Sequence, residues 1–321
     1  MMRSVIAAAI ACLSSFAFET AAQSYPTRPV RIVIPWPAGG ITDVIGRAVS
    51  VHYAEALGQP IVIDNRPGAA GTLGAAIVAK AAPDGHTLLM HDVASHCIAH
   101  SLYRTLPYDT LKDFEPIGLV AGSPMVLIAN PSLNVKTVAQ LIALAKSKPK
   151  AINYASSGAG SITHLGAVRL ERMGGIELTH VPFKGSVPAA ASVISGETSV
   201  SFSTLPAALP HARTGRLVLL AVSFPKRSSQ IPEVPAIAET LNGYDLGLYS
   251  GLWAPRGTQR AIVKRLHDET LVALEQPKVK EMLANVSATP GTMTSEQFGA
   301  FLTKDTRDWG EVVKASGVKV E

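Results

Sequence analysis

The chain has 321 residues, of which 47% are hydrophobic and 17% are charged. This length exceeds the needs of one small core and suits two domains of about 100 to 200 residues. The formal net charge is +5, but Lys and Arg are scattered and no basic run with interleaved aromatic residues occurs. This pattern disfavours nucleic-acid binding and favours a globular protein whose surface mildly attracts anions.

The N-terminus has the pattern of a secretory signal. Arg3 is followed by an apolar run from Val5 to Phe18 and then by small residues up to Ala22. We therefore expect residues 1–23 to form a signal peptide, cleaved near Ala22 or Gln23, and the mature protein to lie in the periplasm. The run is shorter than the roughly 20 residues that span a bilayer. A lipid anchor at Cys12, inside the run, is the less favoured alternative.

After the signal, Cys97 is the only cysteine. No intramolecular disulfide is therefore available, although the expected compartment is oxidising. The hydrophobic core has to hold the fold.

Strand and helix patterns alternate through the first half of the chain. Strands are expected at Val30–Ile34, Ile61–Asp64, Thr87–His91 and Glu115–Val120, and helices at Ile41–Leu57, Leu73–Ala81 and Val138–Ser147. This order predicts mostly parallel sheets.

The second half repeats the alternation and then becomes helical. Strands are expected at Ile152–Ala155, Leu178–Pro182, Val200–Phe202 and Leu217–Val222, with helices beginning near Ser161, Val187 and Ala207. A strand at Tyr249–Ala254 precedes helices at Arg260–Leu274, Pro277–Asn285 and Ser295–Ser316, which should pack back onto the first domain. No low-complexity linker is present, so the chain should cross between domains on strands. The expected division is 24–124 plus 249–321 for domain 1 and 125–248 for domain 2.

A first candidate ligand loop, Pro35–Asp43, follows a buried strand and precedes a helix. Its paired glycines let the backbone approach a ligand, and the helix N-terminus offers unpaired N–H groups and the positive end of a dipole to an anion. Thr42 or Asp43 would cap the helix. In the competing interpretation, the loop is a tight strand-to-helix turn in which the glycines serve geometry alone. The candidate ligand residues are Trp36, Ala38, Gly39, Gly40, Thr42 and Asp43.

A second loop of the same kind, Ser156–Ser161, lies between a strand and a helix that runs through His164. Ligands of open α/β sheets bind outside the carboxyl ends of the strands, so two such loops from two domains define a cleft. The candidate residues are Ser157, Gly158, Ala159, Gly160, Ser161 and His164.

Nucleotide binding and serine hydrolysis are disfavoured. The phosphate-loop pattern is absent, and Gly158-Ala159-Gly160 lacks the third glycine of the dinucleotide fingerprint. Ser161 is better explained as a helix N-cap than as a nucleophile for His164.

A polar cluster from His91 to His100 has a composition typical of metal sites. His96 and His100 would share a helical face, which allows a secreted metal-dependent enzyme as a rival function. No second ligand pair accompanies them. The alternative is that Asp92, Ser95 and His96 line the mouth of the cleft.

Several segments, taken in order, make the mature chain resemble the Bug family of periplasmic solute receptors, which serve tripartite tricarboxylate transporters. They are Pro35–Arg47, Asn65–Ala69 with Gly71, Lys80–Gly85 with Thr87–Leu89, Leu106–Asp109, Lys112–Phe114, Ser157–Leu165, His180–Gly185 and Trp253–Pro255. The resemblance implies a type II periplasmic-binding-protein fold, in which two open α/β domains are joined by a strand hinge with a ligand cleft between them.

The resemblance also implies a function. The protein would be a non-enzymatic monomer that captures a small organic carboxylate by hinge closure and delivers it to membrane transporter subunits, without a metal or cofactor. The loops at Ala38–Asp43 and Ser157–His164 would hold one carboxylate. Phe183, Lys184, Gly185 and Ser203 or Thr204 would approach the rest of the ligand. A receptor that signals to a membrane sensor is the alternative.

The chain departs from the family pattern at three of these positions. Trp36 replaces a common Phe, Phe183 a usual Tyr, and Ser203 an Asp that many relatives carry. Because an acidic residue at position 203 would favour an amine-bearing ligand, its absence favours a plain carboxylic acid.

Overall fold

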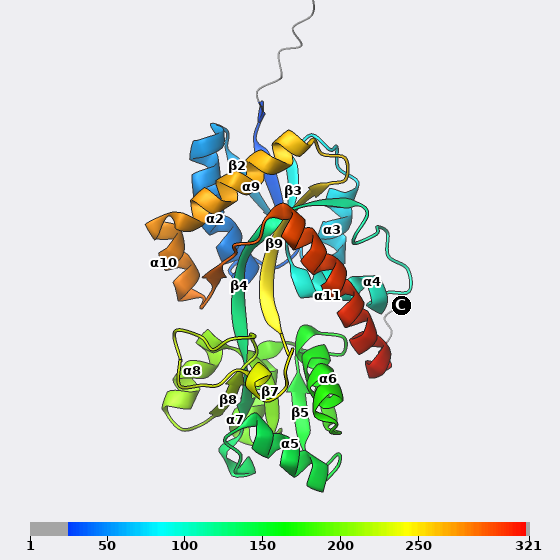
Figure 1. Ribbon diagram of the computed structural model, residues 1–321, viewed down its shortest axis with the longest axis vertical. Coiled ribbons are helices and arrows are strands. Elements are labelled where there is room, and N and C mark those ends of the chain that lie inside the picture. Colours follow the sequence, from blue (N-terminus) through cyan, green and yellow to red (C-terminus); the bar gives the residue numbers. More distant parts are fainter. Residues whose placement is uncertain (1–24, 319–321) are drawn as a thin grey trace, which may run out of the picture.

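The computed structural model describes residues 25–318, which form two lobes stacked along the long axis of the molecule (Figure 1). The predicted signal peptide and its cleavage site lie outside the described residues. The strand order is β2-β1-β3-β9-β4-β7-β5-β6, with β8 and β10 also paired to β4. Within residues 25–318, no helix has the length and apolarity needed to cross a membrane.

Two strands carry the chain between the lobes. β4 (Phe114–Ala129) pairs with β9 (Gly247–Pro255) as far as Pro124, and from Met125 onward it pairs with β7 and β8. The chain therefore crosses on strands, as expected. We propose the domain division at 124/125 and near 248, because β4 exchanges its partners there.

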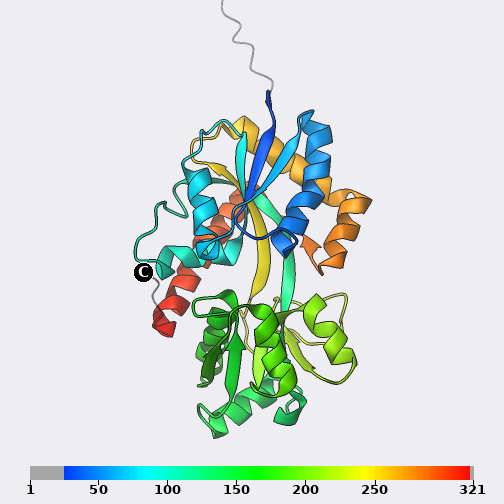
Figure 2. The same ribbon diagram turned by 180° about the vertical axis from the view of Figure 1, so that it is seen from behind.

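The first lobe is built on a sheet with helices on both faces (Figure 2). Its other strands are β1 (Val30–Ile34), β2 (Ile61–Asn65), β3 (Thr87–Asp92) and β10 (Thr289–Pro290). Its helices are α2 (Ile41–Leu57), α3 (Thr72–Ala79), α4 (Val93–Leu102), α9 (Arg260–Glu275), α10 (Pro277–Asn285) and α11 (Ser295–Ser316), and Ala69–Gly71 forms a short 3-10 helix.

The second lobe repeats this architecture on a smaller sheet. Its strands are β5 (Asn153–Ser156), β6 (Thr179–Pro182), β7 (Val200–Thr204) and β8 (Val218–Val222). Its helices are α5 (Val138–Ser147), α6 (Ile162–Gly174), α7 (Ser186–Ser195) and α8 (Leu205–Arg213), with 3-10 helices at Pro131–Leu133 and Ile237–Glu239.

The sheet is mixed rather than mostly parallel. β1 runs parallel to β2 and β3, and β5 to β6 and β7, but β9 is antiparallel to both β3 and β4. The reason is that β9 returns from the second lobe and enters the first sheet from the opposite end.

Two elements of the first lobe differ from the prediction. α4 was not predicted as a separate helix, and β4 continues nine residues past the predicted end at Val120, to Ala129.

The late helices pack back onto the first lobe, and the last of them also contacts the second lobe. α9 and α10 pack on α2, where the Tyr53 hydroxyl donates to the Leu266 carbonyl at 2.9 Å. The buried Trp253 of β9 packs on Phe298 of α11, with ring centroids 5.2 Å apart. α11 then continues beside α6 of the second lobe, so a helix that packs on the first sheet also contacts the second lobe.

Candidate ligand-binding site

A cavity of about 470 Å³ lies where the two lobes meet. The first lobe contributes the loop after β1, Ala70 and one face of α4, and the second lobe contributes the loop after β5 and the starts of α7 and α8. Met125 of β4 and Leu248 of β9 line it at the crossing strands. The cavity therefore sits at the carboxyl ends of β1, β3, β5 and β7, where open α/β sheets bind ligands.

Helix N-termini converge on this cavity. The lining residues include the N-caps of α2, α4, α6 and α8, which are Gly40, Asp92, Ser161 and Thr204, and the first residue of α7, Ser186. Each helix start offers free N–H groups and the positive end of a dipole. Among the described residues that line the cavity there is no Lys, Arg or His. The donors that the cavity offers to an anion are therefore backbone N–H groups and uncharged side chains such as the Ser and Thr hydroxyls.

Asp43 holds the first loop in place from outside the cavity lining. Its Oδ2 accepts the Gly39 N–H at 2.8 Å and the Arg47 Nε–H at 2.9 Å, and its Oδ1 accepts from Asn65 Nδ2 at 2.9 Å. Burial by itself raises the pKa of Asp43, but these hydrogen bonds outweigh it and the pKa is lowered. Asp43 therefore shapes the loop as a carboxylate.

The other first-loop candidates divide into two groups. Trp36, Gly40 and Thr42 line the cavity, whereas Ala38 and Gly39 are exposed and do not. Gly39 has a φ of +83°, which explains the glycine by turn geometry. The Trp36 ring lies edge-on to His91, with centroids 5.8 Å apart.

The second loop places Ser157, Gly160 and Ser161 on the cavity. The Ser157 N–H donates to Thr163 Oγ1 at 2.8 Å, and Ser161 Oγ accepts the His164 N–H at 3.3 Å as the N-cap of α6. The Gly158 carbonyl accepts a hydrogen bond from the Ser161 hydroxyl at 2.6 Å, and Gly158 itself has a φ of +132°. Hydrogen bonds within the loop therefore fix its shape before a ligand arrives.

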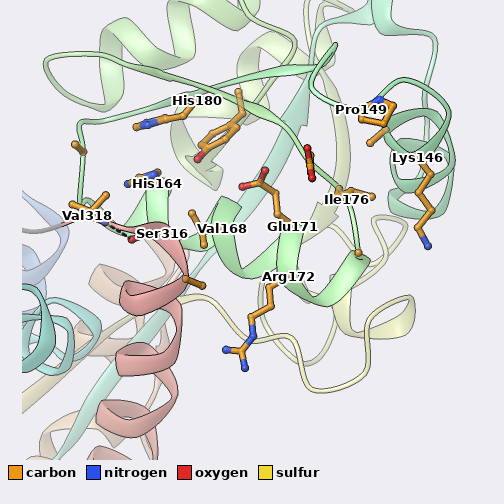
Figure 3. Close-up of a pocket in the computed structure, with 16 residues that line it drawn as sticks. Lys146, Pro149, His164, Val168, Glu171, Arg172, Ile176, His180, Ser316 and Val318 are labelled. Atoms are coloured by element: carbon orange, nitrogen blue, oxygen red, sulfur yellow. Dashed lines mark hydrogen bonds between the residues drawn. The ribbon is translucent and has the colours of Figure 1, made fainter.

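Ala159 and His164 face a different pocket of about 780 Å³, on the other side of the same loop (Figure 3). The ring of His164 stacks on His180 at a centroid distance of 3.9 Å, and its Nδ1 accepts the Gly160 N–H at 3.0 Å. Burial and the neighbouring His180 lower the pKa of His164 to about 4. His164 therefore supports the loop from behind as a neutral ring.

The remaining candidates lie along the second lobe, and of these only Thr204 lines the cavity. The Phe183 N–H donates to the Ser156 carbonyl at 2.9 Å and its ring packs on the second-lobe core. Lys184 is exposed, Gly185 is the N-cap of α7 with a φ of +115°, and Ser203 is buried opposite Val126.

The largest contribution that the sequence candidates missed is one face of α4. Ile98, Ala99, Leu102 and Tyr103 continue the lining from Asp92 and Ser95. In the sequence, the signal that could have identified these lining residues is their recurrence every three to four positions after Asp92, which places them on one helix face. Of the three residues weighed for the cleft mouth, Asp92 and Ser95 line the cavity and His96 does not.

The His91–His100 cluster disperses in the fold. His96 is buried among Phe114, Trp253 and His91, and its Nε2 lies 2.9 Å from the Thr110 carbonyl, to which it donates. His100, in contrast, is exposed. In the described part of the chain no group of three His, Cys, Asp or Glu side chains is arranged to hold a metal ion.

The fold and the cavity define the class of protein, a type II periplasmic-binding-protein receptor of the mixed α/β kind. A structure of a protein from R. palustris with adipate is similar to this chain with a TM-score of 0.77 and 33% identity, covering 92% of this chain and 99% of that one. MatC from Rhodopseudomonas palustris with bound malate gives a TM-score of 0.74 and 32% identity, covering 90% and 100%.

The sequence places the chain within this class. The family model described as the tripartite tricarboxylate transporter family receptor matches residues 45–318, and the chain belongs to this family. Protein BugT of Bordetella pertussis is 34% identical over 96% of this chain and 95% of its own length. The family consists of solute-binding receptors and not of enzymes, as the sequence resemblance predicted.

Proposed function

We propose that the mature protein is a monomeric periplasmic receptor that captures a small organic carboxylate between its lobes and delivers it to the membrane subunits of a tripartite tricarboxylate-type transporter. The observation that carries this proposal is the inter-lobe cavity, which several helix N-termini face and to which no described Lys, Arg or His contributes. Relatives of the same family were solved with adipate and malate, which supports a carboxylate ligand.

In the proposed cycle, the carboxylate docks on the helix start of one lobe and the second lobe then closes over it. β4 and β9 are the connections that would bend, because β4 exchanges partners between Pro124 and Met125. Each charge-assisted hydrogen bond contributes about 1.5 to 3 kcal/mol. Three or four of them, less the ordering costs, correspond to micromolar affinity, about −8 kcal/mol.

Thermal unfolding tests the proposal. The mature protein, unfolded and refolded to remove carried-over solute, is measured with adipate, malate, aromatic acids, monocarboxylates and uncharged amides of the same skeletons. At a hundredfold excess over the dissociation constant, a true ligand adds about 2.7 kcal/mol and raises the melting temperature by roughly 2 °C or more. A selective shift with an acid, absent with its amide, supports the proposal; equal shifts for acid and amide, or none at all, would refute it.

Delivery needs its own test. Uptake of the identified acid is compared in cells that carry or lack this receptor, with the transporter membrane subunits present in both. We expect uptake to require the receptor. Unchanged uptake without it, while binding persists in vitro, would reject delivery and leave capture standing.

A further inference from the structure

Asp92 is the only Asp or Glu among the described residues that line the cavity. It is 5% exposed, and its Oδ1 accepts the Ser95 N–H at 2.7 Å as the N-cap of α4. No cation among the described residues forms an ion pair with it, and burial raises the pKa of its carboxyl to about 6 against the opposing Ser95 hydrogen bonds. Its hydrogen bonds among the described residues all come from Ser95, and an ionised carboxylate has about four lone-pair sites, so Asp92 can accept a further hydrogen bond from a ligand.

The same helix presents an apolar surface beside this acceptor. Ser95 follows Asp92 by one turn, Ile98 and Leu102 continue along the cavity side of α4, and Tyr103 lines the cavity directly after the helix ends. Residues three and four apart share a helix face, so the wall changes from polar to apolar along the helix. Ile162 and Leu248 extend the apolar lining from the second lobe and from β9.

We propose that Asp92 determines specificity: the solute is a carboxylate with an apolar body and a hydrogen-bond donor, a hydroxyl or an ammonium, that binds Asp92. This inference rests on the proposed function, because it presupposes that the helix N-termini hold the solute's carboxylate. A dicarboxylate would bring a second negative charge into a poorly solvated space that already contains Asp92. Like charges repel strongly there, so dicarboxylates of matched length bind more weakly.

The test uses ligands that differ only at the end remote from the carboxylate. One series is hexanoate, 6-hydroxyhexanoate, 6-aminohexanoate and adipate. The other is benzoate, 4-hydroxybenzoate, 4-(aminomethyl)benzoate and terephthalate. Titration calorimetry measures each with the wild type, Asp92→Asn and Asp268→Asn. In the Asp92→Asn variant, the amide oxygen can still cap Ser95, but the side chain offers a donor instead of a charged acceptor. Asp268, paired with Lys264 on the surface of α9, is the control for the same change of net charge.

The wild type should bind a hydroxyl or ammonium ligand at least tenfold more tightly than the matched dicarboxylate. Asp92→Asn should lower the ratio of these two affinities, donor ligand over dicarboxylate, by tenfold or more. Asp268→Asn should leave this ratio unchanged. Whichever of the hydroxyl and ammonium ligands binds more tightly identifies the donor group that Asp92 accepts. If Asp92→Asn does not fold, Asp92→Ser removes the charge while a hydroxyl remains to cap α4.

Three results are distinguishable. A wild type that prefers a dicarboxylate, or a ratio that Asp92→Asn and Asp92→Ser leave unchanged, overturns the role of Asp92 while carboxylate capture stands. Binding of no carboxylate at all, in these series or in the wider panel above, overturns the proposed function and this inference together.

Discussion

Gly160 of the second lobe lies directly against Leu102 of the first. A β-carbon built at Gly160 would be 3.1 Å from Leu102 Cδ2, closer than side chains normally approach. Both residues line the inter-lobe cavity. The second loop and α4 therefore meet at a point where only hydrogen fits without displacement.

Replacing Gly160 by Ala should weaken ligand binding about tenfold or more, because the new methyl group displaces Leu102 or the loop. The φ of +75° at Gly160 adds backbone strain of about 1 to 2 kcal/mol. Gly215→Ala is the matched control, since its φ is +72° and nothing lies within 4 Å of a β-carbon there. Both variants should lose stability in urea unfolding, and only Gly160→Ala should lose affinity. Equal affinity in the two would contradict the close lobe contact.

Asp43 should support binding without touching the solute. Asp43→Ala removes the acceptor for Gly39, Arg47 and Asn65, and should reduce the free energy of unfolding by about 2 kcal/mol. It should also weaken binding, because the backbone before α2 is no longer held. Asp84→Ala, which removes a turn acceptor for the His86 N–H, should reduce stability alone. Undiminished affinity in Asp43→Ala would separate the loop from the binding site.

His96 should contribute a loss of stability as the pH drops from about 6.5 toward 4. Burial lowers the pKa of His96 to about 4, whereas in the unfolded chain it has its ordinary value of 6.5, so the unfolded state binds more protons in this window. This linkage contributes a loss of about 2 kcal/mol between pH 7 and pH 5. His96→Gln, whose amide replaces Nε2, should remove this contribution, so that between pH 7 and pH 5 the variant loses about 2 kcal/mol less in urea unfolding than the wild type does. His100→Gln, on the exposed side of α4, should leave the slope as in the wild type.

Two arginines on α6 should differ in their effect on stability. The Arg169 guanidinium carbon lies 5.4 Å from the Trp309 ring centroid, and its Nη1 donates to the Asp245 carbonyl at 2.8 Å. Arg169→Ala removes the positive charge that lowers the pKa of the buried Asp245 and Asp305 most strongly, and should cost about 3 kcal/mol.

Arg172 is the internal comparison, one turn further along α6. It pairs with Glu311 of α11 at 2.6 Å, and both side chains are about half exposed. Arg172→Ala should cost less than about 1 kcal/mol. Similar losses for Arg169→Ala and Arg172→Ala in urea unfolding would show that the buried cluster does not depend on Arg169.

Local patterns were sufficient for most of the secondary structure. α2, α5 and α10 have the bounds that hydrophobic spacing and stop signals predicted, because periodicity and end signals are properties of adjacent residues. The two glycine loops were also recognisable, since a strand that runs into glycines and then into a helix is a local pattern. Their arrival at one cavity followed from the rule on strand ends, and the family resemblance named the class of protein.

Tertiary structure decided which side chains face the cavity. Asp43 and His164 sit on the predicted loops, yet their hydrogen bonds to Gly39 and Gly160 place them behind the loops. The wall of α4 and the antiparallel entry of β9 depend on contacts between segments more than a hundred residues apart, such as Asp92 with Ser250. Sequence periodicity reports which face of an element is buried, but not which distant element buries it. The position of Asp92 on the cavity lining is therefore a property of the folded chain.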